Sequence, residues 1–241
     1  MNNFFLTTFN KRLYDEYAKD FIKTYLKTKQ TVPLVCYVEE DDFSMYPQHE
    51  NIKYFNIFKE VPEIKSFIER NKNKEVKSFM HDGVRFCYKV YAQYAGRNLG
   101  KRQIFIDADC VFIKQIPERW YDDFIGDCYF SYYPRPSTYT ETGFIMFNCQ
   151  SELVQKFFDR YIESYNTDEI YDMKTQNDSV VFDNILKEFP EKTVKGHGAG
   201  DAIPAEGWHN HVMARCPVLS PYVDHRKGER KSMKNSPELM R

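Results

Sequence analysis

The sequence predicts an α/β fold, with a mostly parallel sheet flanked by helices. Short apolar runs of strand-forming residues alternate with amphipathic helical stretches in the N-terminal half, a pattern typical of parallel sheets covered by helices. The 241 residues are 42% hydrophobic and include 20 Phe and 18 Tyr, which is enough for a large core. Internal repeats and low-complexity linkers are absent from the sequence, so we expect a single domain over residues 1–241 with two halves, 1–113 and 114–241.

The N-terminal half predicts strands and helices in turn. Apolar residues at a 3.6-residue spacing mark the first helix (Leu13, Tyr17, Phe21, Ile22, Tyr25) and a later one (Val84, Cys87, Tyr88, Tyr91, Ala92, Ala95). The later helix should end at Gly96 or Gly100. The expected order is a strand at 4–9, the first helix, strands at 32–38 and 52–55, a charged helical segment facing water at 60–77, the later helix, and a buried strand at 103–113.

The C-terminal half predicts two strands, two helices and a loop-rich tail. Strands at 127–133 and 142–147 are separated by a turn containing Pro134 and Pro136. Ser151 is placed to cap a helix, and a second helix is expected near 177–189. Gly, Pro, His and charged residues dominate from Gly196 onward, and loops of that length attached to a domain often carry function.

Composition excludes several kinds of partner. The formal net charge is -1, from 34 basic and 35 acidic residues, so no overall field attracts nucleic acid or a membrane surface. The six cysteines are scattered without a C-x-x-C pair, which predicts free thiols rather than a disulfide scaffold. The sequence shows neither a signal peptide nor the roughly 20 apolar residues of a membrane helix. We expect a soluble protein of a reducing compartment, with no nucleic acid and no integral membrane segment.

Two aspartates interrupt the apolar run at 103–113. Asp107 and Asp109 are one residue apart, so they project to the same side if the strand stays regular. Buried carboxylates are costly unless they are paired, hydrogen-bonded or bound to a cation, and hard oxygen ligands suit Mg²⁺ or Mn²⁺. The pair therefore predicts a metal site for a phosphate-bearing substrate. The alternative is a pair of turn-forming aspartates at the end of a strand.

A second group of polar residues lies near the C-terminus. His225 is followed by Gly228 and Lys231 at three-residue intervals. Imidazole is a competent Mn²⁺ ligand, glycine lets the backbone approach a phosphate, and lysine supplies a point charge for it. The alternative is a solvated basic run in a tail.

The combination of D-x-D on a strand and a late H-x-x-G-x-x-K resembles family 8 glycosyltransferases, the glycogenin and lipopolysaccharide galactosyltransferase group. The stretch Gly143-Phe144-Ile145-Met146-Phe147-Asn148 resembles a strand of that family at which a small residue lets the sugar lie near the backbone. The resemblance implies a GT-A (Rossmann-like) fold that binds a nucleotide-sugar, expected to be linked to UDP, together with Mn²⁺ or Mg²⁺. It also implies transfer of the sugar to an acceptor hydroxyl with retention of configuration, with nucleotide bound by 1–113 and sugar and acceptor by 114–241. The alternative is inversion, for which a carboxylate such as Asp178 or Glu141 would serve as general base on the acceptor.

The resemblance also implies roles for individual residues. Asp109 and His225 would bind the metal, and Asp107 would share it or contact the ribose. Lys231 and the backbone of Gly228 would meet the diphosphate. The residues expected to seat the base and ribose are Thr7, Thr8 and Asn10.

The transferred sugar has its own candidates. Arg85 and Lys89 share a helix face, and similar enzymes place a basic residue of this helix against the donor. Asn177 and Asp178 would lie beside the sugar, with Glu141 as a further catalytic candidate. His197 is a binding candidate from a glycine-containing segment. The alternatives are a surface pair for the two basic residues and helix capping for Asn177 and Asp178.

Other functions stay open. A sugar-phosphate nucleotidyltransferase would share the sheet and the metal, although residues 7–12 lack the glycine-rich loop usual in such enzymes. A phosphatase of the haloacid dehalogenase type normally carries Thr two residues after the second Asp, where this chain has Val111. A non-catalytic module that binds nucleotide-sugars is the third alternative. The expected location is the cytoplasm, in a bacterial or viral setting rather than the Golgi.

Overall fold

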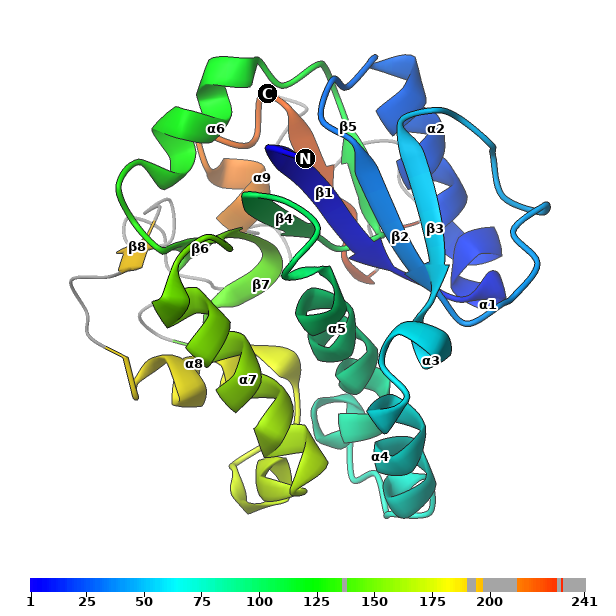
Figure 1. The fold of residues 1–241 in the computed structure, drawn as a ribbon, viewed down its shortest axis with the longest axis vertical. Helices are drawn as coiled ribbons and strands as arrows, with labels where there is room; N and C mark the ends of the chain where they lie inside the picture. The colour runs from blue at the N-terminus through cyan, green and yellow to red at the C-terminus, as the bar shows by residue number, and fades with distance from the viewer. Residues whose placement is uncertain (136–137, 190–193, 197–211, 229–230, 232–241) are drawn as a thin grey trace.

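A computed structural model describes residues 1–135, 138–189, 194–196, 212–228 and 231. Its centre is a seven-stranded sheet in the order β3-β2-β1-β4-β7-β6-β8 (Figure 1). The strands are β1 (Asn3–Thr8), β2 (Leu34–Val38), β3 (Ile52–Asn56), β4 (Arg102–Ile106), β6 (Phe130–Tyr133), β7 (Glu141–Asn148) and β8 (Val194–Gly196). Among these strands β7 runs antiparallel to both of its neighbours, so the sheet is mostly parallel, as predicted.

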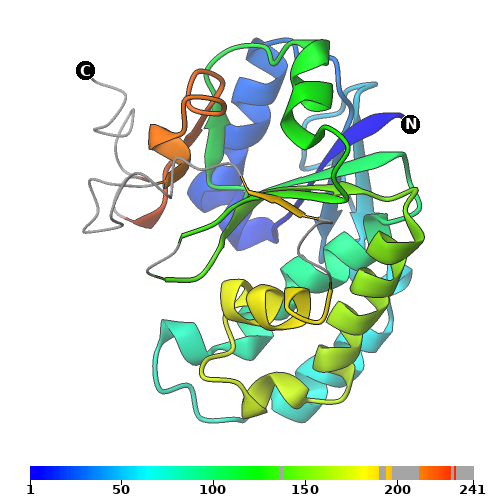
Figure 2. The ribbon, with the colours of Figure 1, turned by 90° about the vertical axis from the view of Figure 1, so that its left-hand side faces the viewer.

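Helices cover both faces of this sheet (Figure 2). One face carries α2 (Lys19–Lys27) and α6 (Glu118–Ile125), and the other carries α4 (Glu63–Asn71), α5 (Gly83–Gly96), α7 (Glu152–Asn166) and α8 (Asp178–Leu186). The shorter helical elements are α1 (Lys11–Leu13), the π-helical η1 (Tyr14–Ala18), α3 (Ile57–Glu60), the 3-10 helices η2 (Phe79–His81) and η3 (Glu169–Asp172), and α9 (Val212–Arg215).

Strand β1 divides the core between the two faces, because successive side chains of a strand point in opposite directions. Phe5 packs edge-on against Tyr25 of α2 and Tyr121 of α6, with ring centroids 6.5 and 6.0 Å apart. Leu6 points to the other face and meets α5 at Gly96, where an added Cβ would lie only 2.2 Å from the Leu6 Cδ1 atom. Gly96 thus lets α5 lie directly on the sheet.

The expected strand at 103–113 is two strands, which corrects the prediction. β4 ends at Ile106 and β5 (Cys110–Phe112) belongs to a separate two-stranded sheet with β9 (Val223–His225). The three residues between them form a turn, closed by a hydrogen bond from the Cys110 N–H to the Asp107 carbonyl (3.0 Å). The expectation of two aspartates projecting from one regular strand is therefore wrong, and the turn reading of the sequence describes the backbone correctly.

Three further corrections concern helices. α6 was not expected, although it carries the buried Trp120 and Phe124. The segment at 60–77 does not lie wholly in water, because α4 buries Ile64 and Phe67. The first helix is interrupted by the π-helical turn η1, which contains Tyr17.

Other local expectations are confirmed. Ser151 caps α7 by accepting a hydrogen bond from the Leu153 N–H (3.2 Å), and all six cysteines are free thiols. Within the described residues, the tail predicted to be loop-rich contains the short elements α9 and β9. No helix among the residues that the structure describes has the length and apolarity required to cross a membrane.

Candidate functional site

The turn between β4 and β5 places two carboxylates where the strands of the parallel sheet end. The Asp107 N–H donates to the Gly143 carbonyl on β7 (2.9 Å), which fixes the start of the turn against the sheet. In parallel sheets, ligands bind beyond the carboxyl ends of the strands. Asp107 and Asp109 lie at such an end, as the sequence predicted.

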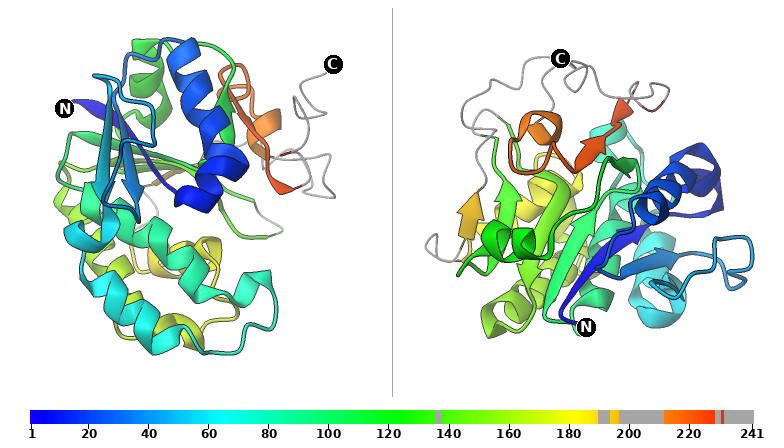
Figure 3. Two further views of the ribbon diagram at one scale, coloured as in Figure 1. Left: turned by 90° about the vertical axis from the view of Figure 1, so that its right-hand side faces the viewer. Right: turned by 90° about the horizontal axis from the view of Figure 1, so that it is seen from above.

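His225 reaches this turn from the other end of the chain. β9 pairs antiparallel with β5 so that His225 lies opposite Cys110, and the Arg226 N–H donates to the Asp109 carbonyl (3.0 Å). The His225 Nε2 atom is 3.0 Å from Asp109 Oδ1 and 3.9 Å from Asp107 Oδ2. The small β5–β9 sheet (Figure 3) therefore brings His225 to two aspartates that precede it by more than 100 residues in the sequence.

The charges of this cluster stabilise one another. Burial works to raise the pKa of the Asp109 carboxyl, but His225, Lys231 and Lys227 outweigh it and hold that pKa below its usual range. Burial also works to lower the pKa of His225, and the Asp109 carboxylate reverses this and raises it. The pKa of Asp107 is raised, first by burial and then by repulsion from Asp109. A cation between the two aspartates would relieve that repulsion.

The donor set fits a divalent metal. Ligand atoms of Asp109, Cys110 and His225 lie within 4.8 Å of one another. Burial raises the pKa of the Cys110 thiol well above its ordinary value, so its sulfur is protonated, whereas the carboxylates are natural ligands of Mn²⁺ or Mg²⁺. Gly143 leaves open the space between Asp107, Glu141 and His225: a Cβ at Gly143 would lie 2.9 Å from Asp107 Oδ2, from Glu141 Oε1 and from His225 Cε1.

Lys89 connects the metal-binding candidates to α8. Its Nζ atom is 3.0 Å from Asp107 Oδ1, 2.6 Å from Asp178 Oδ2 and 3.3 Å from the Thr142 hydroxyl oxygen. Burial works to lower the pKa of Lys89, but the two carboxylates raise it, and Lys89 together with Thr142 holds the pKa of Asp178 below its usual range against the effect of burial. Asp178 is therefore an ionised carboxylate fixed in place at the start of α8.

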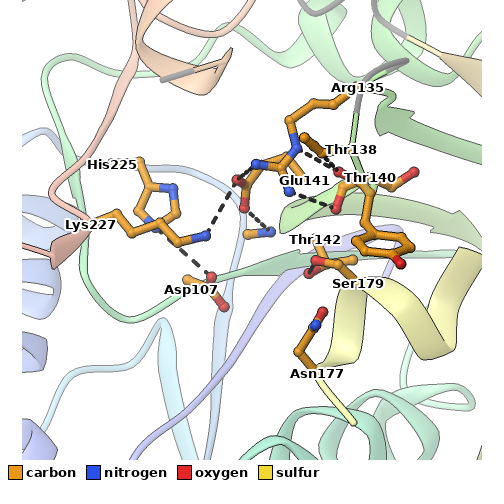
Figure 4. A network of polar contacts seen from close by, with 12 residues as sticks. Asp107, Arg135, Thr138, Thr140, Glu141, Thr142, Asn177, Ser179, His225 and Lys227 are labelled. Atoms are coloured by element: carbon orange, nitrogen blue, oxygen red, sulfur yellow. Dashed lines mark hydrogen bonds and ion pairs between the residues drawn. The ribbon is translucent and has the colours of Figure 1, made fainter. Parts of the chain in front are cut away.

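Glu141 lies on β7, two residues before Gly143, and is 1% exposed (Figure 4). Its Oε1 atom accepts a hydrogen bond from the Gly143 N–H (3.0 Å), and its Oε2 atom is 3.4 Å from Arg135 and 3.5 Å from Lys227. Glu141 thus joins the β6–β7 connection to the segment that follows β9.

Lys231 and Gly228 extend the cluster along the C-terminal segment. The Lys231 Nζ atom lies 3.6 Å from Asp109 Oδ2 and 4.1 Å from the centre of the Tyr17 ring. Gly228 has a φ of 62°, in the left-handed region that favours glycine. Tyr17 thus lies next to the cation that pairs with Asp109, and burial, followed by the charges of Asp109 and Asp107, raises the pKa of Tyr17.

The remaining candidates do not all join this cluster. Arg85 is exposed and pairs with Asp82 of its own helix start (3.5 Å). The Asn10 side chain caps α1, and Asn177 caps α8 next to Asp178. Thr7 and Thr8 end β1 opposite Cys36 and Tyr37 of β2, with the Thr7 hydroxyl buried and lacking a hydrogen-bond partner among the described residues. His197 lies outside the described residues.

Sequence reasoning missed four side chains of this cluster. Lys227 occupies a variable position within H-x-x-G-x-x-K, and Arg135 lies between two prolines of a turn, so neither belongs to a recognisable pattern. Tyr17 was counted as part of an apolar helix stripe, and Cys110 as a small core residue. Cys110 joins the cluster through the register of β5 with β9, Tyr17 through its contact with Lys231, and Arg135 and Lys227 through their ion pairs with Glu141. All of these contacts depend on tertiary structure.

No protein-family model matches the chain, and no curated protein matches it. Its structure resembles that of mouse xyloside xylosyltransferase 1 in the apo form, with a TM-score of 0.54 and 13% identity over 81% of this chain and 85% of that one. It also resembles the bifunctional glycosyltransferase WbbM (TM-score 0.54, 12% identity, 94% of this chain, 46% of that one) and GlyE of Streptococcus pneumoniae TIGR4 (0.51, 10%, 78% and 44%). The chain therefore spans less than half the length of WbbM and of GlyE. At these identities the likeness shows the fold: the chain has the α/β fold of these glycosyltransferases.

Proposed function

We propose that the protein is a metal-dependent glycosyltransferase that moves a sugar from a nucleotide-sugar, linked to UDP, to an acceptor hydroxyl. The observation that carries this proposal is the meeting of Asp107, Asp109 and His225 at the carboxyl ends of the strands. Their place in a fold shared with glycosyltransferases supports it. The more specific membership of family 8 and the hexosyltransferase class belong to the same proposal.

Asp107, Asp109 and His225 would hold Mn²⁺ or Mg²⁺. When bound, the ion neutralises the charge that builds on the departing nucleoside diphosphate. Lys231, 3.6 Å from Asp109, would add a second positive charge beside the diphosphate, and the Gly228 backbone would approach the phosphates because glycine has no side chain. Thr7 and Thr8, at the end of β1, would meet the nucleoside.

Asp178 would act on the sugar. Fixed by Lys89 and Thr142, its carboxylate keeps its charge and can stabilise the positive charge that builds at the anomeric carbon. Inversion needs a general base on the acceptor. The two carboxylates considered for that task, Asp178 and Glu141, are both ion-paired, which supports the retention of configuration that the family resemblance implies.

The test mixes the full chain with Mn²⁺ and a panel of nucleotide-sugars and measures the release of nucleoside diphosphate, with and without candidate acceptors. We expect release from a UDP-sugar that depends on the metal and is lost in Asp109→Ala, whereas Asp172→Asn, at an exposed carboxylate of η3, behaves as wild type. Unchanged turnover in Asp109→Ala at saturating Mn²⁺ contradicts the proposal. Binding without turnover indicates a binding module, and pyrophosphate release from a nucleoside triphosphate and a sugar phosphate indicates a nucleotidyltransferase.

A further inference from the structure

Lys227 pairs with Glu141, one of the two carboxylates that lie close to Gly143, the other being Asp107. Lys227 belongs to the segment that follows β9, two residues after His225, and its ammonium pairs with Glu141 on β7 (3.5 Å). Figure 4 shows Lys227 extending past Asp107 to reach that carboxylate. A Cβ on Gly143 would lie 2.9 Å from Glu141 Oε1 and 2.9 Å from Asp107 Oδ2, so the two carboxylates border the same small space. Asp107 is thus the alternative anion for this lysine.

An ion pair between Lys227 and Asp107 would interfere with metal binding. The Oδ1 atom of Asp107 already pairs with the Lys89 ammonium (3.0 Å). Its Oδ2 atom lies 3.9 Å from His225 Nε2, next to the space that Gly143 leaves open. A second ammonium on Oδ2 would occupy the oxygen that remains for a metal ion. Lysine has a flexible four-carbon stem, so its head group follows the nearest strong negative charge.

Glu141 is held too firmly to follow Lys227. Its Oε1 atom accepts the Gly143 N–H (3.0 Å), and Arg135 on its other side is anchored by hydrogen bonds to the Tyr139 carbonyl (2.5 Å) and the Thr140 carbonyl (3.3 Å). The Glu141 carboxylate is therefore held in place between Arg135, which is anchored, and Lys227, which can move.

We propose that Glu141 is a positioning residue that holds Lys227 away from Asp107 and so keeps an Asp107 oxygen available to the metal. This inference rests on the proposed metal site. It assigns Glu141 no contact with the sugar, and it makes Lys227 a competitor of the metal whenever Glu141 loses its charge.

The test measures Mn²⁺ binding to the full chain by the electron paramagnetic resonance signal of free Mn²⁺, without any substrate. Glu141→Gln keeps an oxygen for the Gly143 N–H but removes the charge, and we expect it to weaken Mn²⁺ binding about tenfold or more. Adding Lys227→Met to this variant removes the competing cation, so the double variant should return to within about threefold of wild type. Asp183→Asn is the matched control, because this carboxylate also supports the same loop, by accepting the Thr140 N–H (2.9 Å), yet should leave Mn²⁺ binding unchanged.

The outcomes separate this inference from the proposed function. If the wild type binds no Mn²⁺, both fall. If the wild type binds and Glu141→Gln binds equally well, the positioning role alone is overturned. A loss that Lys227→Met does not restore also overturns it, because Glu141 then acts as a ligand or through the fold. Circular dichroism checks folding, and if Glu141→Gln fails to fold, Glu141→Asp, which keeps the charge but withdraws it by one methylene, is compared with and without Lys227→Met in the same way.

Discussion

Replacing Lys89 by Met tests whether its ammonium holds Asp107, beside the proposed metal site, and Asp178, at the start of α8, together. Methionine keeps an unbranched stem of similar length, so the perturbation is the loss of a charge between Asp107 and Asp178, 3.0 and 2.6 Å away. The Lys89 and Asp178 side chains are only 10% and 9% exposed. Removing one partner of a buried ion pair leaves an uncompensated charge and costs about 3–5 kcal/mol. We expect a loss of about that size in the free energy of unfolding near pH 7.

The size of this loss should depend on pH. In the wild type the pKa of Asp178 lies below its unfolded value, so its ionisation stabilises the fold above that unfolded value, and the contribution disappears as the pH falls through the folded pKa. Without Lys89, the strongest of the effects that oppose burial is lost, so we expect burial to raise the pKa of Asp178 and its ionised form to destabilise the fold. The deficit of Lys89→Met should therefore be largest at neutral pH and shrink as the pH approaches about 4.

Urea denaturation followed by circular dichroism, near pH 7 and near pH 4.5, measures this deficit with a chelator present to exclude metal ions. Adding Asp178→Asn removes the carboxylate left unpaired and should recover about half of the loss or more. Lys187→Met, at an exposed lysine just after α8, should change stability by less than about 0.5 kcal/mol. A deficit below about 1 kcal/mol, or one that does not vary with pH, would refute the reasoning.

Other variants test single contacts. Asp109→Asn should weaken Mn²⁺ binding about 100-fold or more in a calorimetric titration, because it removes a ligand charge and weakens the bond to His225. Gly143→Ala should lower the free energy of unfolding by about 1–3 kcal/mol and weaken Mn²⁺ binding, since its Cβ would lie 2.9 Å from three side-chain atoms. Arg85→Ala should alter neither stability, beyond about 0.5 kcal/mol, nor UDP binding, as its side chain is 51% exposed. Ser151→Ala should cost about 1 kcal/mol in urea denaturation through loss of the α7 cap.

Local patterns predicted most of the fold, because they depend on burial along single elements. The apolar run at 32–38 and the helical stripe from Val84 to Ala95 match β2 and α5 closely. The division of 103–113 into β4 and β5 was not predictable in this way. Cys110–Phe112 is as apolar as β4, and only its pairing with β9, more than 100 residues later, assigns it to another sheet.

The site was predictable where chemistry and position along the chain agree. The cost of burying two carboxylates pointed to Asp107 and Asp109, and the structure places His225 and Lys231 beside them. Arg85 and Lys89 looked equivalent because four residues separate them on one helix face. The structure distinguishes them by depth: Lys89 lies where α5 crosses the ends of β4 and β7, and Arg85 lies at the exposed start of the helix. Such depth is a property of packing that a one-dimensional pattern does not carry.

The charge balance of the cluster makes a final prediction about how metal and nucleotide bind. Among the described residues, four carboxylates (Asp107, Asp109, Glu141, Asp178) are paired with four cations (Lys89, Arg135, Lys227, Lys231). His225 has to be neutral to bind a metal, and with it neutral these charges cancel. A divalent ion alone then leaves two positive charges in a largely buried place, and the diphosphate of a nucleotide would offset them. UDP should therefore tighten Mn²⁺ binding about tenfold or more, and Mn²⁺ should tighten UDP binding by the same factor, because coupling between two ligands is reciprocal. Paired titrations of each ligand with and without the other measure both factors, and independent binding of the two would show that the cluster is not balanced in this way.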